Sequence, residues 1–224
     1  NELIIADRFL ENCTICLQLL KNNFMENGVN LIPSTIMLEQ FEDNENKWLE
    51  KEEEDSSTII EDGQYVFRNA SKDTAYWSWG VNHLDFSKYY NFTIECSITK
   101  IAGTDNGGFG IVWSYQKQDN EAHYFKFCIS GNGYYYFKEF NKGWVDGFQW
   151  TASNHILHEN ETNILTVRKQ GNSVNIYINN TLIVNEKKIP GENMTGTGIG
   201  FSVSSDITIG VDYLYFCNAI VPEF

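Results

Sequence analysis

Aromatic side chains are concentrated in the middle third of the chain, where many of them stand beside asparagine, aspartate or other polar residues. The set comprises Trp77, Trp79, Trp113, Tyr115, Tyr124, Tyr134, Tyr136, Trp144 and Trp150. Sugars offer apolar C–H faces that aromatic rings can cover, while polar side chains nearby bind the hydroxyl groups. Such residues on one sheet face or rim favour carbohydrate binding. The alternative is that the rings fill a β-sandwich core.

Trp144 and Trp150 have polar neighbours along the chain, including Asp146, so they are better candidates for an exposed platform than the other tryptophans. Core and surface positions stay equally open for these two. Strand alternation puts Trp113 on one face with Phe109 and Ile111, which favours a core position for Trp113. The predicted ligand-binding set is Trp144, Trp150, Asp146, Trp79, Tyr115, Tyr124 and Tyr136.

Oxygen-bearing side chains of Asp105, Asn106 and Asp119 fall in expected loops at the sandwich rim. Calcium prefers such oxygen ligands, although these residues do not form a recognisable calcium loop. Calcium at these three residues is therefore the candidate metal site, and no other cofactor is expected.

Two further pairs could bind a metal, but a simpler interpretation is favoured for each. His155 and His158 fall in an expected loop, where surface histidines are common. Cys13 and Cys16 have zinc-knuckle spacing but no second pair, and they lie on the apolar stripe of an expected helix. Packing is favoured over metal or redox chemistry for both cysteines.

Residues 3–27 are predicted to form one amphipathic helix, because apolar residues recur there at helical spacing. Gly28 and Pro33 would end it. We expect residues 1–33 to be this helix and a linker, which either packs on the rest of the chain or ends an upstream domain. An exposed stripe would favour a homodimer through the helix.

From residue 34 onwards the chain alternates short apolar–polar segments with turn signals, about thirteen strands in all. Asp62-Gly63, Gly171-Asn172 and Asn179-Asn180 are predicted hairpin turns. A further strand is predicted between Trp144 and Trp150. So many locally connected strands must split into two packed sheets. The expected fold is all-β: a two-sheet antiparallel β-sandwich of the jelly-roll type over residues 34–218, with the N-terminal helix before it and a tail at 219–224.

The formal net charge of −14 and the sequence pI near 4.6 argue against nucleic acid and anionic membranes as partners. Apolar runs are too short for membrane insertion. Five sparse cysteines do not form a disulfide framework, and Cys96 and Cys128 are expected to be small buried residues. This pattern, with no visible signal peptide, slightly favours a cytoplasmic over a secreted location, although six Asn-X-Ser/Thr sequons leave a secretory compartment open.

A series of motifs along the strands is similar to the concanavalin-A-like lectin/glucanase superfamily, with laminin-G-like domains and the 3-keto-disaccharide-hydrolase-like domains as its nearest members. The motifs lie at 109–113, 124–127, 133–135, 143–144, 150, 163–168, 174–179, 198–201 and 211–214. The resemblance covers about residues 39–217 and implies a jelly-roll fold. It implies carbohydrate binding, protein binding or glycan cleavage, because one fold hosts many functions.

Enzymes of the glucanase branch cleave with paired carboxylates in a Glu-X-Asp-X-X-Glu pattern, which this sequence lacks. Asp146, Glu139 and His123 are the nearest candidates for catalysis. The sequence therefore predicts a non-catalytic recognition module that binds carbohydrate through an aromatic-lined face or rim. A glycoside hydrolase-like enzyme and a protein-interaction domain of a larger intracellular protein remain the alternatives.

Overall fold

The computed structural model describes residues 34–72, 76–81, 83–118, 121–145, 149–158, 160–189 and 194–218, with backbone only at 76–79, 81 and 118. The predicted helix at 3–27 and the tail at 219–224 lie outside these residues, as does any dimer contact made by the helix. Within the described residues the chain forms fifteen strands and one short 3-10 helix.

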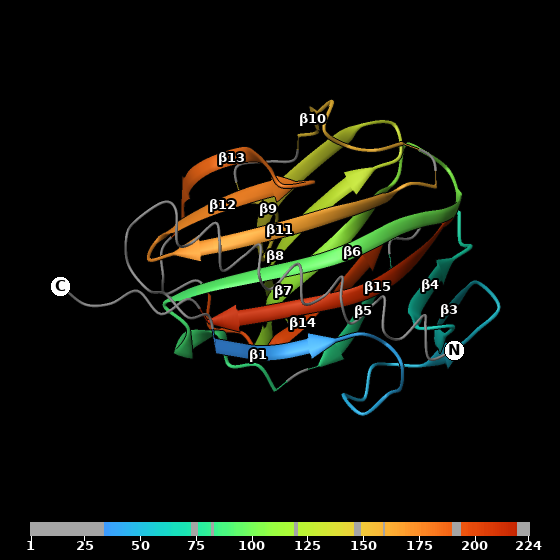
Figure 1. Cartoon of the computed structure of the whole chain (residues 1–224), viewed down its shortest axis with the longest axis horizontal. Coiled ribbons are helices and arrows are strands. Elements are labelled where there is room, and N and C mark those ends of the chain that lie inside the picture. Colours follow the sequence, from blue (N-terminus) through green and yellow to red (C-terminus); the bar gives the residue numbers. More distant parts are fainter. Residues whose placement is uncertain are drawn as a thin grey trace, which may run out of the picture.

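The strands build two antiparallel sheets that face each other, so the predicted β-sandwich is confirmed (Figure 1). In chain order they are β1 (Ser34–Glu39), β2 (Lys51–Glu52), β3 (Ser56–Glu61), β4 (Gln64–Asn69), β5 (Tyr76–Val81), β6 (Asn91–Gly103), β7 (Gly108–Gln118), β8 (Glu121–Ser130), β9 (Tyr134–Asn141), β10 (Thr151–Ala152), β11 (Thr162–Gln170), β12 (Ser173–Ile178), β13 (Thr181–Lys188), β14 (Gly198–Val203) and β15 (Ile207–Asn218); η1 is Phe86–Lys88.

Nine strands form the front sheet of Figure 1, in the order β13-β12-β11-β6-β15-β4-β3-β2, with β1 also paired to β15. Six strands form the sheet behind it, in the order β10-β9-β8-β7-β14-β5. The two short strands β4 and β1 lie end to end along one side of β15: β4 pairs with its first half and β1 with its second. Strands β13 and β10 are edge strands, and they lie on the same side of the sandwich.

Strand alternation fills the space between the sheets. In β6, Phe92, Ile94, Cys96 and Ile98 are fully buried on one face, as predicted. Trp113 of β7 is also in the core, where its ring stacks on Phe125 and Phe137. Residues two apart on a strand share a face, so the pattern of the sequence places these side chains directly.

Hairpin turns form where the sequence predicted them. Asp62 and Gly63 both have positive φ, 51° and 71°, as do Asn179 and Asn180, at 49° and 65°. Two successive left-handed residues match the right-handed twist of the strands that they join, and Asn, Asp and Gly reach that conformation at low cost. The Asn179 side chain adds two hydrogen bonds: its Oδ1 accepts one from the Ile164 amide, and its NH2 group donates one to the His155 carbonyl.

The predicted strand from Trp144 to Trp150 is wrong for the residues described there. Trp144 makes one isolated bridge to Phe140, Val145 is in a turn, and the next strand, β10, begins only at Thr151. The acidic run at 50–55 is exposed, and it contains the two-residue edge strand β2. Among the residues described, no helix has the length and apolarity needed to cross a lipid bilayer.

The side of β6 that faces away from the core carries a buried carboxylate. Glu95 accepts hydrogen bonds from Thr166 Oγ1 at 3.0 Å and from the Tyr213 hydroxyl at 3.1 Å. Burial raises the pKa of Glu95, although these hydrogen bonds and the nearby Arg168 act against the rise. The folded protein therefore binds this proton more tightly than the unfolded chain does.

This shift makes part of the stability depend on pH. Because the folded pKa is raised, the contribution is greatest below the unfolded pKa of a glutamate and is lost as pH rises through the folded pKa. In the wild type, Glu95 makes the free energy of unfolding fall as the pH rises from the unfolded to the folded pKa. Replacing Glu95 with glutamine should make this fall smaller, which urea denaturation at a series of pH values measures. Glu54→Gln, at an exposed position, is the control and should leave the slope unchanged. If the free energy of unfolding of Glu95→Gln falls with pH as steeply as that of the wild type, the raised pKa does not belong to Glu95.

Candidate functional site

Five of the seven predicted ligand-binding residues have described side chains, and the structure brings all five together on the outer face of the six-stranded sheet. Tyr124 lies between Tyr115 and Phe140, with ring centroids 6.3 and 4.8 Å away. Trp144 packs edge-on against Tyr124 and Tyr136, both at 6.3 Å. The other two predicted residues, Trp79 and Asp146, are not described: Trp79 lies in β5, where only the backbone is given, and Asp146 is outside the described residues.

This aromatic cluster is packed rather than open. Only 1% of Tyr124 and 4% of Tyr136 is exposed, and Trp144 and Trp150 are half-buried. Burial raises the pKa of both tyrosine hydroxyls. Tyr124 and Tyr136 therefore present little area to a ligand, whereas Tyr115, Trp144 and Trp150 keep part of their surface exposed. Ligand binding on the cluster stays a prediction, and its packing also holds neighbouring segments in place.

Trp150 shows which segment the cluster holds. Its ring meets Tyr136 edge-on at 4.6 Å and lies so close to Gly108 that an added methyl group there would come within 2.9 Å of it. The next two residues are β10, which pairs with Tyr134 and Tyr135 of β9. The cluster therefore anchors the start of a segment that runs from β10 through residues 153–158.

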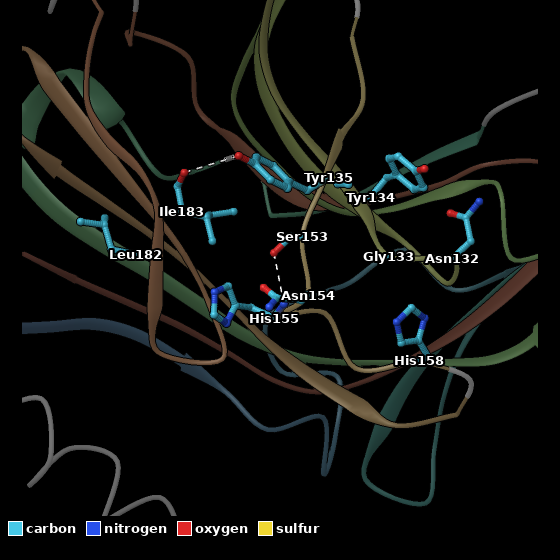
Figure 2. Close-up of a pocket in the computed structure, with 11 residues that line it drawn as sticks. Asn132, Gly133, Tyr134, Tyr135, Ser153, Asn154, His155, His158, Leu182 and Ile183 are labelled. Carbon is cyan, nitrogen blue, oxygen red and sulfur yellow. Dashed lines mark hydrogen bonds between the residues drawn. The ribbon is translucent and has the colours of Figure 1, made fainter.

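Residues 153–158 form one wall of an open groove at the side of the sandwich, between the β9–β10 edge of one sheet and β13 of the other (Figure 2). Its volume is about 660 Å³, within the range of pockets that bind small molecules. The lining residues are Asn132, Gly133, Tyr134, Tyr135, Ala152, Ser153, Asn154, His155, His158, Leu182 and Ile183.

The groove combines exposed apolar surface with hydrogen-bonding groups. Tyr134 is 41% exposed and Leu182 44% exposed, and Figure 2 shows them at opposite ends of the groove. Asn132, Asn154 and His155 are also exposed. At the floor, the Tyr135 hydroxyl donates a long hydrogen bond (3.4 Å) to the Ile183 carbonyl and so connects the two sheets.

The turn before β9 fixes the polar end of the groove. Gly133 has φ of +86°, which favours glycine, and its carbonyl accepts a hydrogen bond from the Ser153 amide at 2.9 Å. Asn132 Oδ1 accepts a hydrogen bond from Ser130 Oγ at 2.7 Å, so the Asn132 NH2 group is available to donate. His158 Nδ1 lies 2.9 Å from the Gly131 carbonyl.

Replacing Gly133 with alanine should disturb this end of the groove. The new methyl group would sit 2.9 Å from His158 Cε1, on a residue held at positive φ. We expect a loss of about 1–2 kcal/mol in the free energy of unfolding, measured by urea denaturation. Gly143→Ala, where nothing lies within 4 Å of the added methyl, is the matched control and should be neutral. Equal effects of the two substitutions would show that the turn does not need glycine.

The catalytic candidates of the sequence are only partly assembled. His123 Nε2 and Glu139 Oε1 are 2.9 Å apart, and Gln116 lies 3.1 Å from the other ring nitrogen. The third candidate, Asp146, is outside the described residues. Glycoside cleavage by the common route needs two carboxylates on either side of the bond, and this contact supplies one.

The calcium candidates also have other partners. Asp105 forms an ion pair with Lys100 at 2.5 Å, and Asn106 Oδ1 accepts a hydrogen bond from Thr104 at 2.6 Å. Asp119 lies outside the described residues. Within the described part of the chain, no three His, Cys, Asp or Glu side chains gather closely enough to hold a metal ion together. Calcium at this rim would have to compete with the Lys100 ammonium for Asp105.

Comparison with known proteins identifies the fold. No family model and no curated protein matches the chain. Among solved structures, a Bacillus subtilis protein of unknown function with a galectin-like fold superimposes with a TM-score of 0.64 at 9% identity, over 84% of this chain and 98% of that one. A structure from work on endo-acting O-glycanases of the human gut microbiota gives 0.59 at 8% identity, over 84% and 100%.

The CBM2 module of the evolved Dit protein of Lactobacillus casei BL23 phage J-1 gives a TM-score of 0.55 at 11% identity, over 88% of this chain and 100% of that one. At these identities the similarity concerns the fold and not the function. The chain therefore has a concanavalin-A-like β-sandwich fold, as the resemblance of its motifs implied.

Proposed function

We propose that this protein is a non-catalytic recognition module that binds carbohydrate in the groove between β9–β10 and β13. The observation that carries the proposal is the composition of the groove: exposed Tyr134 and Leu182 beside the amide groups of Asn132 and Asn154. A sugar ring has an apolar face and a rim of hydroxyl groups, which these two kinds of side chain complement.

Solved structures with a similar fold support the same class of ligand. One is the CBM2 module of a phage Dit protein, and another comes from work on endo-acting O-glycanases that initiate mucin breakdown. The proposal differs from the sequence prediction in its site, because it moves the ligand from the packed aromatic cluster to the open rim.

A second candidate function is glycoside hydrolysis, and the His123–Glu139 contact is the observation that favours it. The two side chains are only slightly exposed, at 12% and 13%. We rank this function below recognition because a buried pair needs an opening before a glycan can reach it.

A glycan array probed with the wild-type protein tests the proposal, with and without calcium. Binding to a defined subset of glycans is the expected result, and a calcium chelator would reveal a contribution from the Asp105 rim. Incubation of the bound glycans with the protein, followed by an assay for new reducing ends, separates recognition from hydrolysis. A folded protein that binds no glycan would overturn the proposal.

A further inference from the structure

Among the residues that the structure describes, the groove has no fixed charge, although the protein as a whole is strongly charged. None of the eleven described lining residues is Asp, Glu, Lys or Arg, whereas the chain carries a formal net charge of −14. A carboxylate or sulfate entering the groove would lose water without gaining a cation, and the field of the whole protein would repel it. An uncharged ligand meets neither penalty.

The His158 side chain supplies a hydrogen-bond acceptor. The Gly131 carbonyl can only accept, so the Nδ1 atom that lies 2.9 Å from it carries the proton. In the neutral imidazole Nε2 then has a lone pair and no hydrogen. A sugar hydroxyl can donate to that nitrogen, whereas an ionised carboxylate has no proton to donate.

Donors and acceptors therefore alternate at this end of the groove. The Asn132 NH2 group donates and His158 Nε2 accepts, and both residues flank the Gly133 turn. A hydroxyl group both donates and accepts, so neighbouring hydroxyls of a sugar ring match this arrangement.

The apolar contacts set the length of the ligand. Tyr134 and Leu182 lie at opposite ends of the groove, on β9 and β13, with His155 and Asn154 along the wall between them (Figure 2). A ligand that touches both must extend along the groove. The groove is open to solvent, so it does not require a chain end.

We propose that the groove binds an uncharged oligosaccharide lying along it, with one sugar hydroxyl donating to His158 Nε2 and sugar rings covering Tyr134 and Leu182. This inference rests on the proposed carbohydrate-binding function and adds the charge class and the length of the ligand.

The test compares acidic oligosaccharides, such as oligogalacturonides, with their carboxyl-reduced counterparts, together with a panel of neutral oligosaccharides of increasing length. Titration calorimetry at about pH 8, where ordinary imidazoles are neutral, measures each affinity. We expect neutral ligands to bind at least about tenfold more tightly than matched acidic ones, with affinity that rises with chain length and is insensitive to added salt. Tighter binding of the acidic member would overturn the inference but leave carbohydrate binding in place. Binding of neither member, by a protein that also binds nothing on the array, would overturn both.

Two variants test the role of His158 separately. His158→Gln retains a side-chain acceptor, so it should keep more of the affinity for the neutral ligand than His158→Leu, which has none. Circular dichroism checks that both variants fold. Equal affinities for the two folded variants would contradict an acceptor role for His158.

Discussion

Replacing Trp113 with alanine should lower the free energy of unfolding by about 3–5 kcal/mol, the usual cost of removing a large aromatic side chain from a core. Trp113 is fully buried, and its ring stacks on Phe125 and Phe137 at centroid distances of 5.8 and 5.7 Å. These three rings come from adjacent strands of one sheet, so the cavity would open where β7, β8 and β9 meet the opposite sheet. Urea denaturation followed by fluorescence measures the loss.

Trp113→Phe is the informative partner of this variant. Among the described residues, the buried indole Nε1 of Trp113 has no hydrogen-bond partner. A buried N–H without a partner costs about 1–3 kcal/mol. Phenylalanine removes that N–H and keeps a ring in the stack, so its loss should be less than half of the alanine loss. If the two variants lose similar free energies of unfolding, stacking and burial of a ring at this position do not account for the contribution of Trp113.

Replacing Tyr134 with alanine should lower affinity for a glycan found on the array by about five- to thirtyfold, equivalent to about 1–2 kcal/mol of binding free energy. Tyr134 is 41% exposed and lines the groove, so the substitution removes little buried surface and stability should change little. Titration calorimetry with that glycan gives the ratio directly.

Two controls make this result specific to the groove. Tyr90→Ala removes another exposed tyrosine, 71% exposed and outside the groove lining, and should leave affinity unchanged. The double variant Trp144→Ala, Trp150→Ala should lower stability, and it should weaken binding only by loosening β10. If the double variant stays as stable as the wild type and loses binding while Tyr134→Ala keeps it, the ligand binds on the aromatic cluster, as the sequence first indicated.

Strand periodicity explains why the fold could be predicted. In β6 the alternation of Phe92, Ile94, Cys96 and Ile98 with polar residues already assigns a core face, and the structure buries all four. The same alternation assigned Trp113 to the core. Periodicity could not predict that Glu95, on the other face, is also buried, because that depends on residues outside β6, such as Thr166 and Tyr213 of the neighbouring strands.

The site could be predicted only in part for the same reason. Tyr134 and Tyr136 lie two residues apart on β9 and share a face, yet one is 41% exposed and the other 4%. Trp150 covers Tyr136, and β10 is too short to bring further residues over Tyr134. A sequence shows which residues share a face, but the path of a returning segment decides which of them a ligand can reach. The sequence did single out three of the lining residues, Tyr134 as an aromatic residue and His155 and His158 as a loop pair, but nothing in it placed them in one groove.

The last strand of the sandwich has a consequence for how the chain folds. β15 lies between β6 on one side and β4 and β1 on the other, and one of its contacts, from Thr35 to Tyr215, joins residues 180 positions apart. Pairing across such a separation must wait for a large loop to close, which slows folding. On the ribosome, β1, β4 and β6 would all emerge with an unpaired edge and keep it until residues 207–218 have left the exit tunnel. During that interval the unpaired strand edges of the nascent chain are open to pairing with other chains, which is the route to aggregation.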